Sequence, residues 1–551
     1  MKWYVDPING DNSNSGHSIT SPLKDLSNFE YKGVSEPVLH HGDKIFIKRG
    51  TTLQCKNVKL YANNFELQRH DYVYVGAYGF GDDPILTHHK ILERKNLAKY
   101  VDNIYYVDLT IDGITSGFEG TGSNIGFIYD AKKDVIYGNR LFELGELNEF
   151  MDFYIADDKL YIYAEALESI PVEMILPLGN PIMSCDANTI YENLHFTLGG
   201  SHGLATTQDG NYNIIVQNCK FDKLGGSKLS GVTRYGNGFE IFGDGYDIQV
   251  QNCIFEDIYD TGVTYQGTNV TFENCSFNNN LFKRCYQACE NWCNNPEKGK
   301  GYINCTFNNN ICLLSGYGFG GKGRESGYHF ILSNTNCENT DITIKNNIFF
   351  KAKNGCYETI DLTNKDLKFS NNKIYLYDDQ LINKNYAQTI TQFEEYINAT
   401  GEDASSKFIV LESKYKDNVV EQLLLASDLF MSGLNHIYSN NTNDYQKQNN
   451  VISKLELTTN YLENVTSKSI TIIDNQMIVN LKARVRAEIP AYTTYAFCKN
   501  VKGFAITQQY IDEAKQHYIN LADNQIYLQS SVSVPVGTNI NLTGVITLDE
   551  A

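Results

Sequence analysis

Three acidic residues, Glu240, Asp260 and Glu290, fall at or near equivalent places of a strand that the sequence repeats. Successive residues of a strand point to opposite faces, so Phe239 and Ile241 are predicted to point inward and Glu240 outward. Glu290 is predicted to lie in the same outward column, and Asp260 to precede the intervening strand by one turn. Carboxylates on strands two apart would be separated by roughly 9 to 10 Å, which is twice the strand spacing.

Paired carboxyl groups at such a spacing can hydrolyse a glycosidic bond. One protonates the leaving oxygen, while the other activates water or attacks the sugar. Inverting enzymes need about 6.5 to 9.5 Å between the two groups, and retaining enzymes about 5 to 5.5 Å. The predicted separation of Glu240 and Glu290 is near the range for inverting enzymes, and the separation of Glu240 and Asp260 could be shorter. The alternative is that all three are ordinary acidic residues on the solvated face of a sheet.

Several residues near these carboxylates are predicted to contact a ligand: Tyr259, Thr264, Gln266, Trp292, Asp244, Lys322 and Arg324. Trp292 is either a platform for a sugar ring or a packing residue, and Asp244 lies in an Asp-Gly turn. Lys322 and Arg324 follow the glycine-rich run 316–321 and could hold an acidic sugar. A polysaccharide lyase would need such cations, or bound Ca²⁺, to neutralise a uronate. The run also matches a dinucleotide fingerprint, but it opens no predicted helix.

The elements that must position these residues are the strands of a solenoid. A phrase that starts with Asn returns seven times, at Asn193, Asn218, Asn252, Asn274, Asn304, Asn346 and Asn371. A phrase that returns at such intervals along the sequence is typical of stacked strand coils. The phrase predicts three columns: the Asn residues; Cys219, Cys253, Cys275 and Cys305; and Phe221, Phe255, Phe277 and Phe307. The sequence therefore predicts an all-β fold, a right-handed parallel β-helix, with the handedness taken from the usual chirality of parallel crossovers.

Composition restricts the classes of partner and cofactor. The 551 residues carry a net charge of −19, which argues against a nucleic acid and mildly against a strongly anionic polymer. The spacing of Cys285, Cys289 and Cys293 would suit a metal on a helix, but the repeat places them on turns and strands. We therefore predict no metal and no cofactor, except Ca²⁺ if the protein is a lyase. Met1–Asp6 begins no apolar segment, so neither a signal peptide nor membrane insertion is expected.

Changes of pattern divide the chain into five predicted parts: β-helix entry coils (1–99), an inserted β-subdomain (100–185), the β-helix core (186–378), a helical linker or stalk (379–469) and a C-terminal β-sandwich (470–551). Asp152–Tyr163 is predicted to form a hairpin. Thr389–Thr400 is predicted to be a helix that Gly401 ends. A second helix is predicted over Val420–Leu434, either packed on the end of the solenoid or forming the stalk of an oligomer.

Parts of the solenoid resemble known β-helix proteins. Tyr4–Gly16, Gly42–Gly50 and Val75–Ile85 resemble the opening of pectate-lyase-like β-helix proteins. Tyr259–Gln266, followed by Glu290–Trp292, resembles a β-helix group with the phrase Tyr-Asp-Ala-Gly-Val-Thr-x-Gln and then an acidic residue, Asn or Tyr, and Trp. Thr261 replaces the Ala of that phrase.

The C-terminal part resembles the head domains of phage tail proteins, on Ile489–Ala491, Ala522–Tyr527 and Pro535–Thr538. Joined to a β-helix, this resemblance implies a phage tailspike or receptor-binding protein. It further implies a homotrimer in the virion tail, made in the host cytoplasm, with a host-surface polysaccharide and phage tail or baseplate proteins as partners. Such a protein would bind and cleave the polysaccharide, with hydrolysis favoured over lyase chemistry. The alternatives are a glycan-binding adhesin without catalysis, a polysaccharide lyase, and a free bacterial glycan-degrading enzyme.

Overall fold

The computed structural model describes residues 1–30, 39–60, 72–111, 124–185, 187–206, 211–294, 299–321, 324, 327–332, 339–360, 362 and 366–411, and beyond these only the strands of the C-terminal region. The chain forms two compact units, Met1–Gly79 with Asp83–Ile437, and Phe80–Asp82 with Tyr438–Ala551. The first unit holds the solenoid and all of the candidate site residues.

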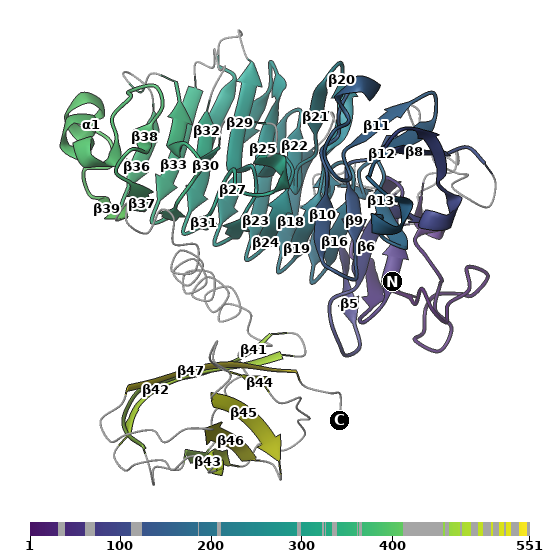
Figure 1. Cartoon of the computed structure of the whole chain (residues 1–551). Coiled ribbons are helices and arrows are strands. Elements are labelled where there is room, and N and C mark those ends of the chain that lie inside the picture. Colours follow the sequence, from purple (N-terminus) through teal and green to yellow (C-terminus); the bar gives the residue numbers. More distant parts are fainter. Residues whose placement is uncertain are drawn as a thin grey trace. The chain divides into compact units, whose positions relative to one another are not determined.

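Three sheets of mainly parallel strands run along the solenoid (Figure 1). The first sheet contains β1 (Lys2–Val5), β2 (Lys44–Lys48), β5 (Val73–Tyr78), β15 (Thr189–Glu192), β18 (Asn211–Gln217), β23 (Gly245–Gln251), β26 (Thr271–Glu273), β27 (Ser276–Asn278), β30 (Gly301–Asn308), β33 (Asn339–Lys345) and β36 (Leu367–Ser370). The second contains β3 (Thr52–Gln54), β6 (Ile85–Glu93), β16 (His195–Gly199), β19 (Lys220–Leu224), β24 (Ile254–Ile258), β28 (Leu281–Lys283), β31 (Ile311–Leu313), β34 (Ile348–Phe350), β37 (Lys373–Tyr377) and β39 (Lys407–Leu411). Antiparallel strands β9 (Ile128–Asp130), β10 (Val135–Tyr137) and β13 (Glu173–Pro177) extend the second sheet.

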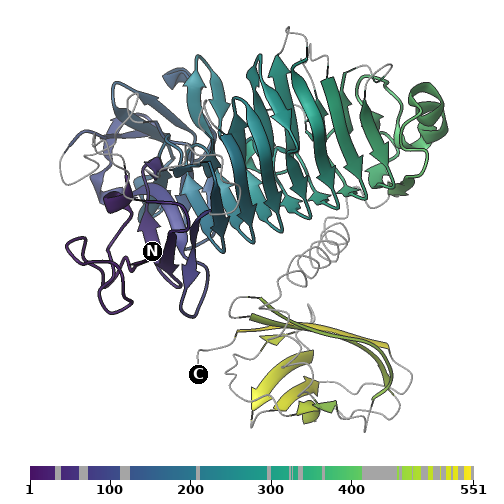
Figure 2. The same cartoon turned by 180° about the vertical axis from the view of Figure 1, so that it is seen from behind.

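The third sheet carries most of the candidate site. It contains β4 (Val58–Lys59), β14 (Met183–Ser184), β17 (Leu204–Ala205), β22 (Phe239–Phe242), β25 (Thr261–Thr268), β29 (Gln287–Asn294), β32 (Tyr328–Leu332), β35 (Gly355–Thr359) and β38 (Leu381–Asn383). Each coil passes from the first sheet to the second and then to the third, so the predicted parallel β-helix is confirmed. The first coils and the C-terminal helix α1 (Phe393–Thr400) lie at opposite ends of the solenoid (Figures 1 and 2).

A column of phenylalanine rings fills the interior behind the second sheet. Phe196 stacks on Phe221 with ring centroids 4.8 Å apart, Phe221 on Phe255 at 4.8 Å, and Phe255 on Phe282 at 5.0 Å. These distances equal the spacing between neighbouring strands, because the rings are carried by strands in register. The prediction that Phe277 and Phe307 continue this column is wrong, since Phe277 pairs with Val250 and Phe307 with Ile344, both in the first sheet.

The asparagine column needs the same correction. Asn218 and Asn252 lie at the turn between the first and second sheets, and Asn279 continues their file. Asn274 belongs to a neighbouring file within the first sheet, beside Asp247. All five residues have a left-handed backbone with φ between 54° and 59°, which Asn tolerates better than most residues. The repeated phrase therefore marks either of two left-handed backbone positions in a coil, and both positions favour Asn.

The smaller elements surround this frame. Strands β7 (Ala98–Val101), β8 (Ile104–Asp108), β11 (Phe153–Ala156) and β12 (Lys159–Tyr163) form a separate antiparallel sheet, with β11 and β12 as the predicted hairpin. Strands β20 (Ser227–Ser230) and β21 (Thr233–Tyr235) form a hairpin between β19 and β22. Short 3₁₀ helices are η1 (Ser27–Phe29), η2 (Arg94–Asn96), η3 (Leu144–Glu146), η4 (Leu167–Ser169), η5 (Phe319–Gly321) and η6 (Ile390–Gln392).

The predicted helix before Gly401 is confirmed. Thr389 and Gln392 form a capping box at the start of η6, and Gly401, with φ 76°, donates its N–H to the Ile397 oxygen at the end of α1. The predicted helix over 420–434 lies outside the described residues. Among the described helices, none has the length and apolar character to span a membrane.

The C-terminal unit contains two antiparallel sheets. One consists of β40 (Glu456–Leu457), β43 (Thr494–Lys499), β46 (Gln525–Ser530), β45 (His517–Ala522) and β44 (Gln509–Tyr510), and the other of β41 (Leu462–Ile473), β42 (Gln476–Val485) and β47 (Asn539–Thr547). Together with the solenoid they make the described chain all-β apart from the short helices.

Candidate active site on the third sheet

Glu240, Thr264 and Glu290 form a column across three neighbouring strands. Glu240 of β22 pairs with Thr264 of β25, and Thr264 pairs with Glu290 of β29. The flanking residues Val263 and Tyr265 are buried in the solenoid interior, so the column points outward, as the alternation predicted. Glu240 and Glu290 are thus two strand spacings apart, about 9.5 Å between backbones.

Glu290 is held in a largely desolvated position. One of its oxygens accepts a hydrogen bond from Gln266 Nε2 at 3.0 Å and is 3.5 Å from the Thr264 hydroxyl. Burial, followed by the negative charge of Asp260, raises the pKa of Glu290 to about 8, against the opposing effects of Gln266 and Arg324. This carboxyl group therefore holds its proton at neutral pH.

Asp260 lies at the corner that leads into β25, and it carries an ion pair with Arg324 at 2.8 Å. The Arg324 guanidinium lies between two aromatic rings, 4.7 Å from the centroid of Tyr259 and 4.4 Å from that of Tyr286. It also donates to the Arg234 backbone oxygen at 3.0 Å. Burial alone would lower the pKa of Arg324, but Asp260 and Tyr259 raise it. Arg324 is thus a permanent cation beside one carboxylate of the site.

Arg234 also lies over the Tyr259 ring, with its guanidinium carbon 4.3 Å from the centroid. Burial lowers the pKa of Arg234 to about 10 and that of Arg140 to about 9, and for Arg140 the Arg234 charge adds to this effect. Both bind backbone oxygens of the inserted segment, Arg234 that of Gly126 and Arg140 that of Ile125. Three arginines therefore gather behind Asp260.

Glu240 is embedded in a second hydrogen-bond network. Asn237, which is buried, donates from Nδ2 to Glu240 at 2.6 Å, and His202 Nδ1 is 3.3 Å from the same oxygen. The Asn237 oxygen accepts the Thr261 N–H at 3.1 Å, next to Asp260 in the chain. Asn237 consequently connects the strand of Glu240 to the corner that carries Asp260.

A second outward row flanks the carboxylates. Phe242, Gln266 and Trp292 pair across β22, β25 and β29, two positions after Glu240, Thr264 and Glu290 respectively. Phe242 and Trp292 are half-buried, so each leaves part of its ring to contact a ligand. Rings beside carboxyl groups suit a sugar, which has both apolar C–H faces and hydroxyls.

Asp244 is not brought into this cluster. Asp244 lies at the opposite end of β22, where its side chain accepts the Thr271 N–H at 2.6 Å and lies 3.9 Å from Lys300. It shapes the turn between the third and first sheets. Lys322 lies outside the described residues.

The sequence did not place five residues among the predicted site residues: His202, Asn237, Arg234, Tyr286 and Arg140. All but Tyr286 come from the corner before β17, from the β20–β21 hairpin region or from the inserted segment, where no repeat predicts the register. Tyr286 precedes Gln287, which the repeat did align, and could have been found from that alignment.

The cysteines form no metal site in the part of the chain that the structure describes. Cys285, Cys289 and Cys293 are all buried, and burial raises the thiol pKa of Cys285 and Cys289. Within the described ranges, no group of three or more His, Cys, Asp or Glu side chains is placed to hold an ion.

No family model matches the sequence, and no curated protein matches it. Among solved structures, the chain is similar to the protein XylC in complex with xylose (TM-score 0.40, 11% identity, 74% of this chain and 82% of that chain). It is also similar to a GH136 lacto-N-biosidase from Eubacterium ramulus (0.32, 13%, 74% and 68%). A third is tailspike protein 2 from Escherichia coli O157:H7 bacteriophage CAB120 (0.18, 10%, 67% and 54%). At these TM-scores the similarities assign no function, so the site has to be judged from its own geometry.

Proposed function

We propose that the protein binds a polysaccharide along the outer face of the third sheet and hydrolyses its glycosidic bonds with the carboxyl groups Glu290, Asp260 and Glu240. The observation that carries this proposal is the contrast between two neighbours. Glu290 retains its proton to a pKa of about 8, whereas Asp260 is ion-paired with Arg324. A protonated carboxyl group beside a carboxylate is the arrangement that glycoside hydrolysis requires.

In the proposed mechanism Glu290 is the general acid. It donates its proton to the glycosidic oxygen as the bond to the sugar breaks, so the leaving group departs as a neutral alcohol. Asp260 acts on the sugar's anomeric carbon through a water molecule, from which it takes the proton as the water attacks. Glu240, two strands from Glu290, is the alternative base, since its separation also approaches the inverting window of about 6.5 to 9.5 Å.

Three outward residues would orient the substrate. Trp292 and Phe242 offer ring faces to the sugar, and Gln266 holds the Glu290 carboxyl group by its 3.0 Å hydrogen bond. Thr264, which stands between the two glutamates and is fully buried, fixes the distance between them. Each role follows from the strand register rather than from a flexible loop.

Single substitutions test these assignments. Glu290→Gln, Asp260→Asn and Glu240→Gln are each assayed on purified bacterial surface polysaccharides, with mass analysis of the products. Glu358→Gln is the matched control, because Glu358 lies two strands further along the same column and is paired with Lys384. Loss of cleavage is expected for Glu290→Gln and for Asp260→Asn, or for Glu240→Gln in place of Asp260→Asn where Glu240 is the base, and not for Glu358→Gln; unchanged cleavage in all three would refute the assignment. Intact binding without any products would favour a glycan-binding adhesin.

We further propose that this activity serves a phage tailspike or receptor-binding protein in the virion tail. The support is the resemblance of the C-terminal sequence to phage head domains, together with the confirmed β-helix. The expected form is a homotrimer that acts on a host-surface polysaccharide and attaches to tail or baseplate proteins. Sedimentation of the full chain at three times its 62.3 kDa mass is expected; a monomer at micromolar concentration would count against this role.

The arginines behind Asp260 favour a second candidate activity, a polysaccharide lyase. A lyase must neutralise a uronate and then remove a proton, and Arg324, Arg234 and Arg140 gather positive charge near the site. Their existing bonds to Asp260 and to backbone oxygens argue against it. The products distinguish the two reactions, because hydrolysis adds one water per bond cleaved and elimination leaves an unsaturated sugar without adding water.

A further inference from the structure

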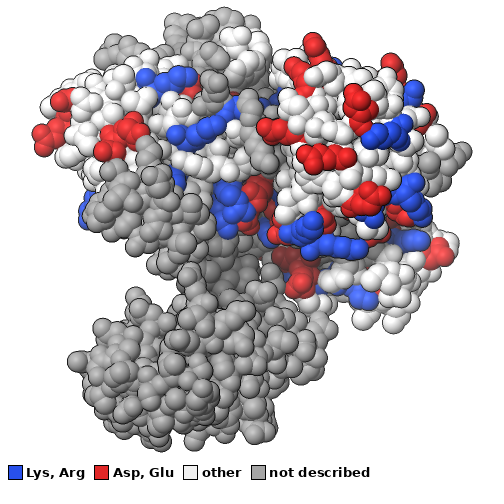
Figure 3. Space-filling view, in the orientation of Figure 1, with Lys and Arg blue, Asp and Glu red and all other residues white. Residues whose placement is uncertain are grey.

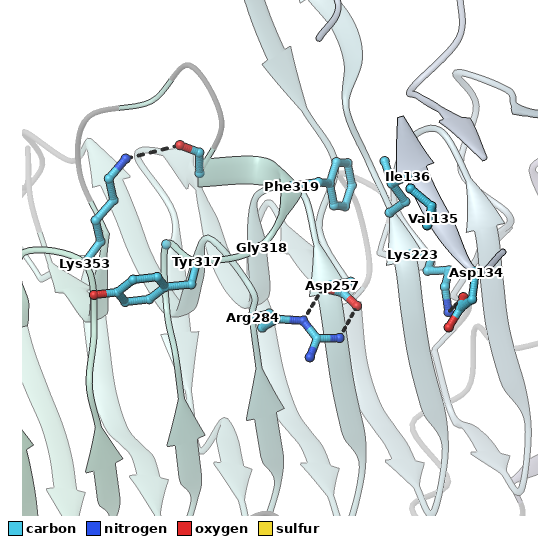
Figure 4. A pocket seen from close by; sticks show the side chains of 12 residues that line it. Asp134, Val135, Ile136, Lys223, Asp257, Arg284, Tyr317, Gly318, Phe319 and Lys353 are labelled. Carbon is cyan, nitrogen blue, oxygen red and sulfur yellow. Dashed lines mark hydrogen bonds and ion pairs between the residues drawn. The ribbon is translucent and has the colours of Figure 1, made fainter. Parts of the chain in front are cut away.

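A cavity of about 520 Å³ lies beside the candidate active site, outside the corner between the second and third sheets (Figure 4). Lys223, Asp257 and Arg284 line it from successive coils. The loop Gly316–Gly321 and the β9–β10 turn, with Asp134 and Val135, enclose it from the two sides. Its size is within the range of sites that bind small molecules.

The charges that line the cavity are already paired. Arg284 forms two hydrogen bonds with Asp257, at 2.7 and 2.6 Å, and Lys223 lies 3.3 Å from Asp134. Lys353 donates to the backbone oxygens of Gly321 and Arg324. An anionic ligand would have to displace a carboxylate to reach Arg284 or Lys223, at the cost of leaving that carboxylate unpaired.

Hydrogen-bonding capacity nevertheless remains on these pairs. Among the described residues, Nε and Nη2 of Arg284 make its hydrogen bonds, to Asp257 and Glu256, and no bond from Nη1 is found. The Asp257 carboxylate can accept more bonds than the two it receives. A neutral hydroxyl could therefore accept from Arg284 and donate to Asp257 without breaking the pair.

Aromatic residues complete the lining. Tyr317 is 45% exposed, with the Lys351 ammonium 4.7 Å from its ring centroid. The Phe319 ring packs on Phe127 at 5.0 Å and on Tyr259 at 5.6 Å. Figure 4 shows the Tyr317 and Phe319 rings on the same loop, with the Asp257–Arg284 pair below Phe319 and to the right of Tyr317. An exposed ring near hydroxyl-binding ion pairs matches both faces of a sugar.

The cavity and the carboxylate cluster are attached to one corner of the solenoid. Asp257 lines the cavity, Asp260 belongs to the cluster, and the buried Tyr259 lies between them in the chain. A branched or folded glycan bound at the carboxylate cluster therefore has the polar surface of the cavity close to it.

We propose that this cavity is a second glycan subsite, which takes a neutral, hydroxyl-rich sugar unit of the same polysaccharide. The proposal rests on the proposed function for the identity of that polysaccharide. Tyr317 stacks on the sugar, and the Asp257–Arg284 pair binds its hydroxyls. A uronate is disfavoured because the arginine and lysine side chains that line the cavity are engaged, Arg284 with Asp257, Lys223 with Asp134, and Lys353 with the backbone of the loop.

The test uses the full chain in the Glu290→Gln background, so that a bound glycan persists. Affinities are measured for reduced oligosaccharides from neutral and from uronate-containing bacterial surface polysaccharides. The variant Tyr317→Ala is compared with Phe393→Ala, a similarly exposed aromatic on α1 at the far end of the solenoid. Neutral oligosaccharides should bind, and Tyr317→Ala should weaken them about five- to tenfold, whereas Phe393→Ala should not.

Three results would overturn the subsite: equal affinity for Tyr317→Ala and its parent, binding restricted to uronate-containing glycans, or no binding in either set. Cleavage by the chain with Glu290 intact is assayed separately. Loss of the proposed activity with Tyr317-dependent binding preserved would leave the cavity assignment standing. Cleavage that depends on Glu290, with no effect of Tyr317 on affinity, would remove the subsite alone.

Discussion

Glu290 and Asp260 show how neighbouring carboxyl groups acquire different roles. Glu290 lies on a strand between buried neighbours, with one amide donor, and its pKa rises to about 8. Asp260 lies at a corner where a guanidinium reaches it. The acid and the base of the proposed reaction are thus separated by environment, since both side chains are carboxylic acids of similar intrinsic strength.

Replacement of the acid should change both the rate and its pH dependence. Glu290→Gln is expected to lower kcat by about 10²- to 10⁴-fold, because an amide cannot protonate the leaving oxygen. In the unmodified chain activity should fall as the pH rises through about 8, where Glu290 loses its proton. The pH profile of kcat checks this, and an alkaline limb that persists in Glu290→Gln would assign it to another group.

Asp403, at the C-terminal end of the solenoid, offers a prediction about stability. It is fully buried, and burial raises its pKa to about 6 despite hydrogen bonds from Ser406 and Asn372. Because the folded state binds the proton more tightly than the unfolded chain, this group's contribution is greatest below pH 4. It is lost as the pH rises from about 4 to about 6.

Asp403→Asn should therefore stabilise the solenoid at pH 7.5 by about 2 to 3 kcal/mol, following from the shift of the pKa, and by almost nothing at pH 4. Urea unfolding of both chains at the two pH values measures the difference. A gain that is the same at both pH values would show that ionisation of Asp403 is not its cause.

At the scale of elements, a buried asparagine ladder joins four coils. The Asn310 N–H donates to the Asn347 side-chain oxygen and the Asn280 N–H to that of Asn310, both at 2.8 Å. Asn347 repeats this with Asn372 at 2.9 Å. Each amide nitrogen also donates to a backbone oxygen one coil back, as Asn310 does to Phe277. The ladder satisfies turn backbone groups that water does not reach.

Removal of one member should be costly. Asn310→Ala leaves the Asn280 N–H and the Phe277 oxygen unpaired inside the solenoid, at a cost of about 1 to 3 kcal/mol each. Asn308→Ala is the control, since its side chain accepts the Lys345 N–H at an exposed position where water can replace it. Chemical unfolding should show a loss several times larger for Asn310→Ala; equal losses would contradict a role for burial.

The same coils show the limit of reading register from repeated residues. The step from Asn252 to Asn274 looked like one coil with a short turn, but Asn279 is the residue that follows Asn252 in its file. The repeated phrase at Asn274 begins between β26 and β27, so it falls earlier in its coil than the phrase at Asn252 does. In contrast, the outward column of Glu240, Thr264 and Glu290 was predicted correctly, because alternating burial specifies the face of each strand.

At the scale of the whole molecule, the chain carries a net charge of −19. Acidic and basic side chains are interspersed over the described face in Figure 3. On the second sheet, Glu256 pairs with both Lys283 and Arg284. A long-range negative field therefore remains, which opposes the approach of a polyanion.

This balance predicts a weak response to salt. For a neutral polysaccharide, kcat/KM should change by less than about twofold between roughly 0.02 and 0.3 M NaCl, since screening acts only on charged partners. Depolymerisation rates at the two salt concentrations provide the measurement, with a glycan of known neutral composition. A rise of about tenfold with salt would indicate a polyanionic substrate that the net charge repels.

The sequence by itself determined the stacked strands, the faces of the third-sheet residues, the helix that ends at Gly401 and the carboxylates worth testing. These follow from alternation, capping and repeats, which are local patterns. Only the tertiary structure decided which asparagines share a file, which arginines reach Asp260 and that a cavity adjoins the corner at Tyr259. These depend on insertions of unequal length between coils, because contacts between residues such as Asp260 and Arg324 are set by how loops fold back and not by any period in the chain.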